Sequence, residues 1–281
     1  MKKVCTVTPF YRDPPLDDEK VSLQVLKKHL GHVDNILIVP EGIGVPPPDF
    51  DIIRLPDENF TSIETYNDLL LTRGFYELFQ EYQYILLYQL DCLVFSPDLE
   101  EWCDRGYDYI GAPWIRNPVK NWMLEPLADD PTIDWASLDV PDERFFYGVG
   151  NGGLSLRRVQ WHLDVLDSRR RYETPQAYWR RTSTSLASGL AQAVKALVKA
   201  TGYWNNVNWF IRECATNEDF FWSRDAGRFV DDTRIPGSLE ALEFAIEVEP
   251  RECYRRNGGR LPFGCHGWYR YDREFWSGFL N

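Results

Sequence analysis

The chain has 281 residues, carries a formal net charge of -12 at pH 7 and has a pI near 4.9. It is long enough to bury a large core in one domain or two. The acidic balance argues against nucleic-acid binding, which needs clustered Lys and Arg. The six cysteines form no CxxC pair, and no stretch approaches the roughly 18 apolar residues of a membrane span. We therefore expect reduced, buried thiols in a cytoplasmic protein.

Predicted strands and helices alternate through the first hundred residues. Short apolar runs predict strands at 3–8, 35–39 and 51–55. Apolar residues at helical spacing predict helices from about Asp18 to Gly31 and from Thr61 to Phe79. This alternation indicates parallel βαβ winding. We expect an α/β fold with a doubly wound, mostly parallel sheet and helices on both faces.

The run Tyr84–Phe95 (YILLYQLDCLVF) contains one carboxylate, Asp91. Such a run is typical of a buried strand in the centre of a sheet. Because burial of an unpaired carboxylate is costly, we expect the strand to end at Leu90 and to place Asp91 at the carboxyl edge of the sheet. A divalent cation is the natural counter-charge there. The alternative is an Asp that only caps a turn.

A glycine-rich segment, Gly148–Gly153, follows a predicted strand at 108–111, a Pro-Trp turn, and residues 116–144, which show little periodicity. The segment matches G-x-G-x-x-G, but we reject a dinucleotide site because that fingerprint opens the first βα unit and leads into a helix, whereas LSL follows here. Glycines let the backbone approach a ligand, and the Asn151 amide can bond hydroxyls. The alternative is a simple glycine turn.

Two further motifs carry titratable groups. Glu218 and Asp219 precede the aromatic run FFW, where a carboxylate can act as a general base; the alternative is that both only favour the first turn of a helix. His266 lies in LPFGCHGW and, with Asp91, would form a mixed oxygen and nitrogen site suited to Mn²⁺; the alternative is a core histidine. We do not expect a zinc site at Cys265, because no second thiol is suitably spaced, nor a Cys-His nucleophile, because the side chains of sequence neighbours usually diverge.

The segment from Arg157 to Lys199 is the one basic region of this acidic protein. Apolar residues at helical spacing predict a helix from about Thr184 to Thr201. The segment could contact an anionic membrane surface or the phosphates of a lipid-linked acceptor, or be purely structural. We expect one domain over 1–281, with a nucleotide-binding half at 1–100 and an acceptor half at 101–281 that includes a helical insertion at about 167–214.

Together, the early βαβ half, YQLDCLVF, DYIGAPW, GNGGLSLR, NED and LPFGCHGW resemble the GT-A glycosyltransferases, and more closely a family of mostly uncharacterised bacterial glycosyltransferase-like domains. The resemblance spans nearly the whole chain. GT-A enzymes usually carry Asp-x-Asp after the strand. Here the motif is Gln89-Leu90-Asp91, so the first Asp is missing and direct metal contact by residue 89 is in doubt.

The resemblance implies a role for each motif. Asp219 matches the catalytic base of inverting members, Glu218 its acceptor-orienting neighbour, and Asp91 and His266 the ligands of Mn²⁺ or Mg²⁺. The residues implied on the donor side are Thr8, Tyr11, Tyr66, Asn67, Gln89 and Asp91. The residues implied on the acceptor or sugar side are Trp114, Gly150, Asn151, Gly152 and Gly153.

The implied activity is metal-dependent transfer of a sugar, with inversion, from a nucleotide-sugar donor, by family habit a UDP-sugar. The acceptor would be a glycan or a lipid-linked saccharide in bacterial surface polysaccharide synthesis, and the enzyme would work in the cytoplasm, including the inner face of the membrane. Two alternatives remain. A sugar nucleotidyltransferase should carry a glycine-rich basic loop after the first strand, but TPFYRDPP has no glycine. A non-catalytic sugar- or nucleotide-binding module would not need Asp91, Asp219 and His266 together.

Overall fold

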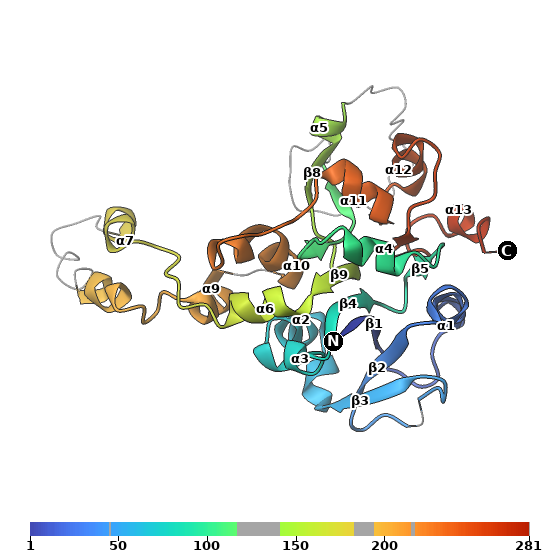
Figure 1. The fold of residues 1–281 in the computed structure, drawn as a ribbon, viewed down its shortest axis with the longest axis horizontal. Coiled ribbons are helices and arrows are strands. Elements are labelled where there is room, and N and C mark those ends of the chain that lie inside the picture. Colours follow the sequence, from blue (N-terminus) through green and yellow to red (C-terminus); the bar gives the residue numbers. More distant parts are fainter. Residues whose placement is uncertain (45, 117–140, 183–193, 215–216, 281) are drawn as a thin grey trace.

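The computed structural model describes residues 1–281 except 45, 117–140, 183–193, 215–216 and 281 (Figure 1). Its main sheet has the strand order β3-β2-β1-β4-β9-β6. The first four strands of that order run parallel, and β9 runs antiparallel to both of its neighbours. These strands are β1 (Lys2–Pro9), β2 (Asp34–Pro40), β3 (Asp51–Leu55), β4 (Tyr82–Tyr88), β6 (Tyr109–Ile110) and β9 (Leu154–Arg158). The prediction of a mostly parallel sheet is confirmed.

Helices cover both faces of this sheet. Ile85 and Leu87 of β4 pack in one apolar core with α2, α3 and α6, whereas Tyr84, Leu86 and Tyr88 pack in a second core with α1, α4 and α11 (Figure 1). Successive side chains of a strand point to opposite faces, so a fully apolar strand requires cover on both. These helices are α1 (Asp17–Leu30), α2 (Ile63–Leu70), α3 (Arg73–Glu77), α4 (Leu99–Asp104), α6 (Val159–Leu166) and α11 (Ser238–Phe244).

Two small sheets accompany the main one. The order β10-β11-β5 joins Ala245–Ile246, Gly264–Cys265 and Leu93–Val94, and the pair β7 and β8 joins Pro113–Ile115 and Phe146–Val149. The remaining elements are η1 (Asp57–Phe60), α5 (Asp142–Phe145), α7 (Pro175–Thr182), α9 (Val207–Cys214), α10 (Glu218–Phe220), η2 (Phe221–Asp225), η3 (Ala226–Arg228), α12 (Pro250–Arg256) and α13 (Arg273–Ser277).

Three local expectations were wrong. The helix expected over 61–79 is divided into α2 and α3, because the Thr72 side chain accepts a hydrogen bond from Phe75 N and starts a new helix. The central strand ends at Tyr88 rather than Leu90, so Asp91 lies in the turn before β5. Trp114, expected in a turn, lies in β7 and faces Gly148 of β8.

The thiol prediction is confirmed for the described cysteine side chains, all of which are free and buried: Cys5, Cys92, Cys103, Cys253 and Cys265. The side chain of Cys214 is outside the described set. None of the described helices combines the length and the hydropathy needed to cross a bilayer.

The insertion at about 167–214, called the basic insertion below, projects away from the sheet at α7 (Figure 1). Residues 194–200 are helical, but the start of the helix expected from Thr184 falls outside the described residues. Val194 and Leu197 in this helix are 55% and 70% exposed, respectively. Their exposure differs from the core-packed helix that apolar spacing usually indicates.

Candidate active site

A cleft of 740 Å³ opens where β1 and β4 end, between Pro9 and Leu90 on one side and Trp114 and Phe220 on the other. This is the carboxyl edge of the parallel strands, and the volume suits a small organic ligand. The candidate residues that line it are Tyr11, Tyr66, Asn67, Gln89, Asp91, Trp114, Asn151, Gly152, Gly153, Glu218, Asp219 and His266. Two candidates do not line it: Thr8 is fully buried within β1, and Gly150 packs behind the lining against Trp114 and Ser223.

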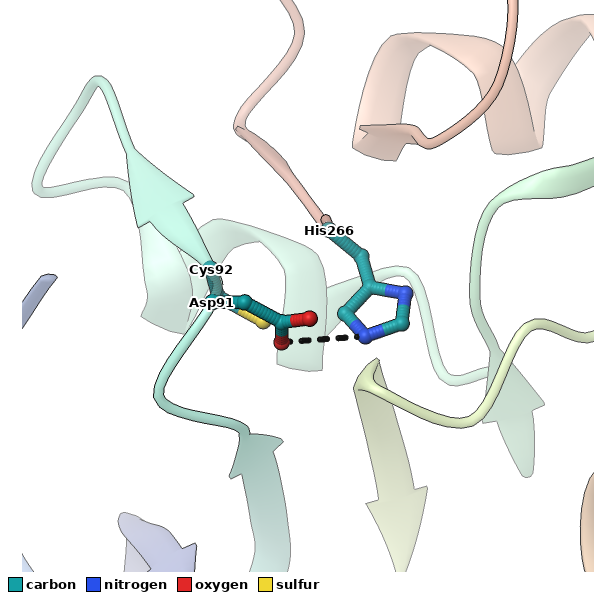
Figure 2. A group of neighbouring side chains, drawn as sticks. All are labelled: Asp91, Cys92 and His266. Atoms are coloured by element: carbon teal, nitrogen blue, oxygen red, sulfur yellow. Dashed lines mark ion pairs between the residues drawn. The ribbon is translucent and has the colours of Figure 1, made fainter. Parts of the chain in front are cut away.

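Asp91 and His266 meet in one half of the cleft, although 175 residues separate them in the chain (Figure 2). The Asp91 carboxylate Oδ1 lies 3.1 Å from His266 Nε2, and the Gln89 side-chain oxygen lies 3.2 Å from the same nitrogen. On its other side the imidazole Nδ1 lies 2.8 Å from the Glu247 carboxylate. Backbone hydrogen bonds from Trp268 N to Asp91 O and from His266 N to Ile246 O hold these segments together.

Charge is balanced in this half of the cleft. Burial disfavours an imidazolium, but the Asp91 carboxylate, assisted by Glu247, outweighs it and raises the pKa of His266 to about 10. Burial also disfavours an ionised Asp91, but His266 and then Arg270, whose Nη2 lies 3.5 Å from Asp91 Oδ2, lower the pKa of that carboxyl. Asp91 is therefore ionised at neutral pH.

This donor set fits a divalent cation once the proton on His266 Nε2 is released, because an imidazole binds a metal only in its neutral form. Neighbouring ligand atoms around an octahedral Mg²⁺, each about 2.1 Å from the ion, lie about 3 Å apart, which is the spacing of Asp91 Oδ1 and His266 Nε2. A carboxylate behind the distal imidazole nitrogen is the usual support of a metal-binding histidine, and Glu247 occupies that place. The Cys92 thiol is also close, but it donates to Gly153 O and burial raises its pKa well above the usual value. The set therefore matches an oxygen- and nitrogen-binding ion rather than a thiolate-bound one.

The second half of the cleft holds Asp219 on the short helix α10. Burial, then the adjacent Glu218 carboxylate, raises the pKa of Asp219 to about 7. Its Oδ1 accepts a hydrogen bond from Phe220 N. This bond favours the ionised form, but less than burial and Glu218 oppose it. A carboxyl group with a pKa near 7 can both take and release a proton at neutral pH.

Glu218 is held from beneath by a buried arginine. Arg157 of β9 is fully buried and binds the Glu218 carboxylate through two hydrogen bonds of 2.9 Å each. Glu218 is predicted to orient the acceptor. In the structure, both of its carboxylate oxygens already accept hydrogen bonds from Arg157.

The glycine-rich loop passes between the two halves. A Cβ on Gly152 would lie 2.2 Å from Glu218 Oε1, and one on Gly153 would lie 2.2 Å from His266 Nε2. Either side chain would collide with a functional group, so the loop requires glycine at both positions. The Gly153 carbonyl also accepts from Gln89 N, which ties the loop to the end of β4.

Aromatic rings form the wall beside Asp219. The Trp114 ring stacks on Phe220 with 4.3 Å between centroids and on Tyr147 with 5.6 Å. All three rings line the cleft. Such a wall offers a flat apolar surface next to polar groups, as a sugar ring requires.

Sequence reasoning missed Glu247, Arg270 and Arg157. Glu247 directly follows the short apolar strand β10, so its position at a strand end was a usable signal of the kind that identified Asp91. Arg157 interrupts an otherwise buried strand, which indicates that a buried counter-charge is needed but not which residue supplies it. Arg270 had no comparable signal.

Comparisons with known proteins add a family and a set of similar folds. A family model described as "Protein of unknown function (DUF5672)" matches residues 49–266. A search of curated proteins finds no match.

Three solved structures are similar to this chain. The galactosyltransferase LgtC in complex with donor and acceptor sugar analogues has 12% identity and a TM-score of 0.45, over 98% of this chain and 95% of LgtC. A glycosyltransferase involved in glycosylation of the major capsid of PBCV-1 has 7% identity and a TM-score of 0.37, over 94% of this chain and 92% of that glycosyltransferase. The mannosyltransferase Ktr4p from S. cerevisiae has 13% identity and a TM-score of 0.30 over 42% of this chain, which spans only 41% of Ktr4p. Identity and TM-score are low in each case, so the chemistry of the cleft rests on its own residues.

Proposed function

This chain belongs to the DUF5672 family, whose description assigns no activity, and we propose that it is a metal-dependent glycosyltransferase. It would move a sugar from a nucleotide-sugar donor, here a UDP-sugar, to a saccharide or lipid-linked saccharide. One observation carries the proposal: a single cleft holds two carboxyl groups whose pKa values are shifted in opposite directions, Asp91 downward and Asp219 upward. Opposed shifts of this kind distinguish a permanently ionised ligand from a group that exchanges protons.

The donor half of the cleft suits a nucleoside diphosphate. Asp91 and His266 would hold a divalent cation, with Gln89 beside them and Glu247 fixing the imidazole. When bound, Mn²⁺ or Mg²⁺ would stabilise the negative charge of the departing diphosphate. Arg270, which also lines the cleft, adds a guanidinium that can contact phosphate oxygens directly.

The base half suits an attacking hydroxyl group. Asp219 in its ionised form would accept the proton of an acceptor hydroxyl, whose oxygen then bonds to the anomeric carbon of the donor sugar. The bond from that carbon to the diphosphate breaks, and the diphosphate leaves with the electron pair. One displacement of this kind inverts the anomeric configuration.

The two alternative functions explain less of the cleft. In a nucleotidyltransferase the loop after β1 should bind the triphosphate, but the segment Phe10–Leu16 contains no glycine and only one basic residue, Arg12. A non-catalytic sugar-binding module would have no use for a carboxyl group that burial keeps near its pKa at neutral pH. Asp219 therefore favours catalysis over binding alone.

A turnover assay tests the proposal. The full chain is incubated with UDP-, GDP- and dTDP-sugars and a mixture of saccharide acceptors, with Mn²⁺ or with EDTA, and release of nucleoside diphosphate is measured. We expect acceptor-dependent release from one donor class that EDTA abolishes, and a product with inverted anomeric configuration by NMR. Absence of release from every donor, or retention of configuration, would contradict the proposal.

We also propose that the basic insertion binds an anionic membrane surface, where a lipid-linked acceptor would be found. Tyr203 and Trp204 are 62% and 37% exposed, and Arg212 lies over the Trp209 ring at 4.1 Å. Exposed aromatic residues beside cations are typical of segments that lie at a lipid interface. We expect flotation with vesicles containing anionic lipid at low salt, and release at 1 M salt. Equal behaviour with neutral vesicles, or no flotation at low salt, would contradict membrane binding.

A further inference from the structure

The arginine beneath the cleft has every hydrogen-bond donor occupied. Besides its two bonds to Glu218, Arg157 donates from Nη1 to Tyr76 Oη at 3.1 Å, from Nε to Ser155 Oγ at 2.9 Å and from Nη2 to Gly152 O at 3.4 Å. A guanidinium has five N–H groups, and these five contacts use all of them. The side chain therefore has one defined position.

This network joins three parts of the cleft. Arg157 belongs to the central sheet, Glu218 begins α10, and Gly152 belongs to the glycine-rich loop. The α10 helix has only three residues, and its N-cap Asn217 makes no side-chain capping hydrogen bond. The helical stretch continues into η2, whose Phe221 and Trp222 are buried in the core and anchor the C-terminal side of α10. On its N-terminal side, the two hydrogen bonds of Glu218 to Arg157 attach it to the sheet.

We propose that Arg157 and Glu218 form a buried positioning pair that holds Asp219 at its place in the cleft and fixes the Gly152 backbone beside it. This assignment rests on the proposed function for the role of Asp219 as base. It removes Glu218 from the acceptor contacts, because both of its carboxylate oxygens face the guanidinium. It also makes Arg157, which does not line the cleft, necessary for transfer.

The pair has an electrostatic effect as well. The charged groups that act on Asp219 are Glu218 and Glu247, which raise its pKa, and Arg157, which lowers it. Arg157 and Glu218 act on the Asp219 pKa in opposite directions. Removal of one should therefore shift that pKa, whereas the two shifts should largely cancel when both residues are removed.

Two variants separate charge from position. Glu218→Gln removes the negative charge and keeps an oxygen for Arg157. The double variant Arg157→Met with Glu218→Leu removes both charges and fills their volume, a replacement that buried ion pairs often tolerate in folding. The matched control is Arg256→Met with Glu252→Leu in α12, a pair at 2.7 Å whose side chains are each 6% exposed and which lies away from the cleft lining.

The first measurement does not depend on activity. Titration of ¹³C-carboxyl-labelled aspartate by NMR, with Asp219→Asn for assignment, should show the Asp219 pKa lower by about one unit in Glu218→Gln. The double variant and the α12 control should show it close to that of the wild type. An unchanged Asp219 pKa in Glu218→Gln would overturn the electrostatic coupling on which the pair depends.

The second measurement is the turnover assay. The folded double variant should lose at least about tenfold in kcat with an unchanged donor KM, because a displaced base slows transfer without weakening donor binding. The control should keep the wild-type kcat. A double variant with the wild-type kcat would overturn the positioning role. If the NMR shift occurs and the wild-type protein transfers no sugar, the proposed function fails while the coupled pair remains.

Discussion

Asp91 and Asp219, two of the carboxyl groups that line the cleft, have different surroundings. Asp91 contacts two cationic groups directly, His266 at 3.1 Å and Arg270 at 3.5 Å. Asp219 follows a second carboxylate, Glu218, and the nearby cation Arg157 already binds that carboxylate with both terminal nitrogens. Cationic groups of the cleft therefore compensate the negative charge of Asp91, whereas no cation among the described residues of the cleft pairs directly with Asp219.

This difference shows how one cleft can hold two functions. Compensation keeps Asp91 ionised, as a ligand for a cation must be. Without it, Asp219 has a pKa of about 7 and can exchange a proton with a substrate near neutral pH. The glycine loop at Gly152 and Gly153 separates the two environments with backbone alone. Substitution of Asp91 should therefore leave Asp219 in place, and substitution of Asp219 should leave Asp91 in place.

The largest effect is expected for Asp219→Asn. Loss of the general base should lower kcat by about 100-fold or more with little change in donor KM. Initial rates of the wild type and of Asp219→Asn, at saturating Mn²⁺, measure this effect. Asp225→Asn, six residues later and paired with Arg228, is the control and should behave as the wild type. A kcat for Asp219→Asn within a factor of two of the wild type would exclude Asp219 as base.

A smaller effect is expected for Glu247→Gln. The variant keeps an oxygen near His266 Nδ1 but removes the charge that supports the imidazole, so Mn²⁺ affinity in the presence of UDP should fall about tenfold. Titration with Mn²⁺ followed by its paramagnetic effect on water relaxation gives the affinity. Glu243→Gln, in the surface network of α11, should have no effect. Equal affinities for Glu247→Gln and the wild type would exclude a supporting role for Glu247.

The smallest effect is on stability and depends on pH. The folded-state pKa of Asp219 is raised from 3.8 to about 7, so ionisation of Asp219 opposes folding increasingly between these values, and fully above pH 7. Asp219→Asn should therefore raise the free energy of unfolding at pH 8 by about 2 to 4 kcal/mol and change it little near pH 4. Urea unfolding at the two pH values measures this. Asp164→Asn at the surface of α6 should show no such dependence, and a destabilised Asp219→Asn at pH 8 would contradict the raised pKa.

Much of the first half of the fold could be predicted from local pattern. The strand expected at 51–55 is β3, and the helix expected from Asp18 begins at Asp17 and ends before Gly31. Apolar periodicity and a terminal glycine specify such elements within a few residues. The division between α2 and α3 could not be predicted in this way. Apolar residues keep their helical spacing across Thr72, although the Thr72 hydroxyl caps a new helix there.

The titratable members of the site could be predicted where they stand at a strand or helix end, but their partners could not. Glu247 lies 19 residues before His266, and Arg157 lies 61 residues before Glu218. Contacts at these separations depend on how β9, α10 and the small sheet are assembled, which no local pattern records. Glu218 could thus be predicted as a carboxylate of the site, but Arg157, which binds that carboxylate, could not.

The division of the cleft is tested most directly by calorimetric titration with UDP in the presence of Mn²⁺, performed on the wild type, Asp91→Asn and Asp219→Asn. We expect UDP to bind the wild type and Asp219→Asn with similar affinity, and EDTA to abolish binding in both. Asp91→Asn should show no metal-dependent binding, because its site has lost the charged ligand. Wild-type affinity in Asp91→Asn, or loss of binding in Asp219→Asn, would contradict the separation of a metal-binding half from a proton-accepting half.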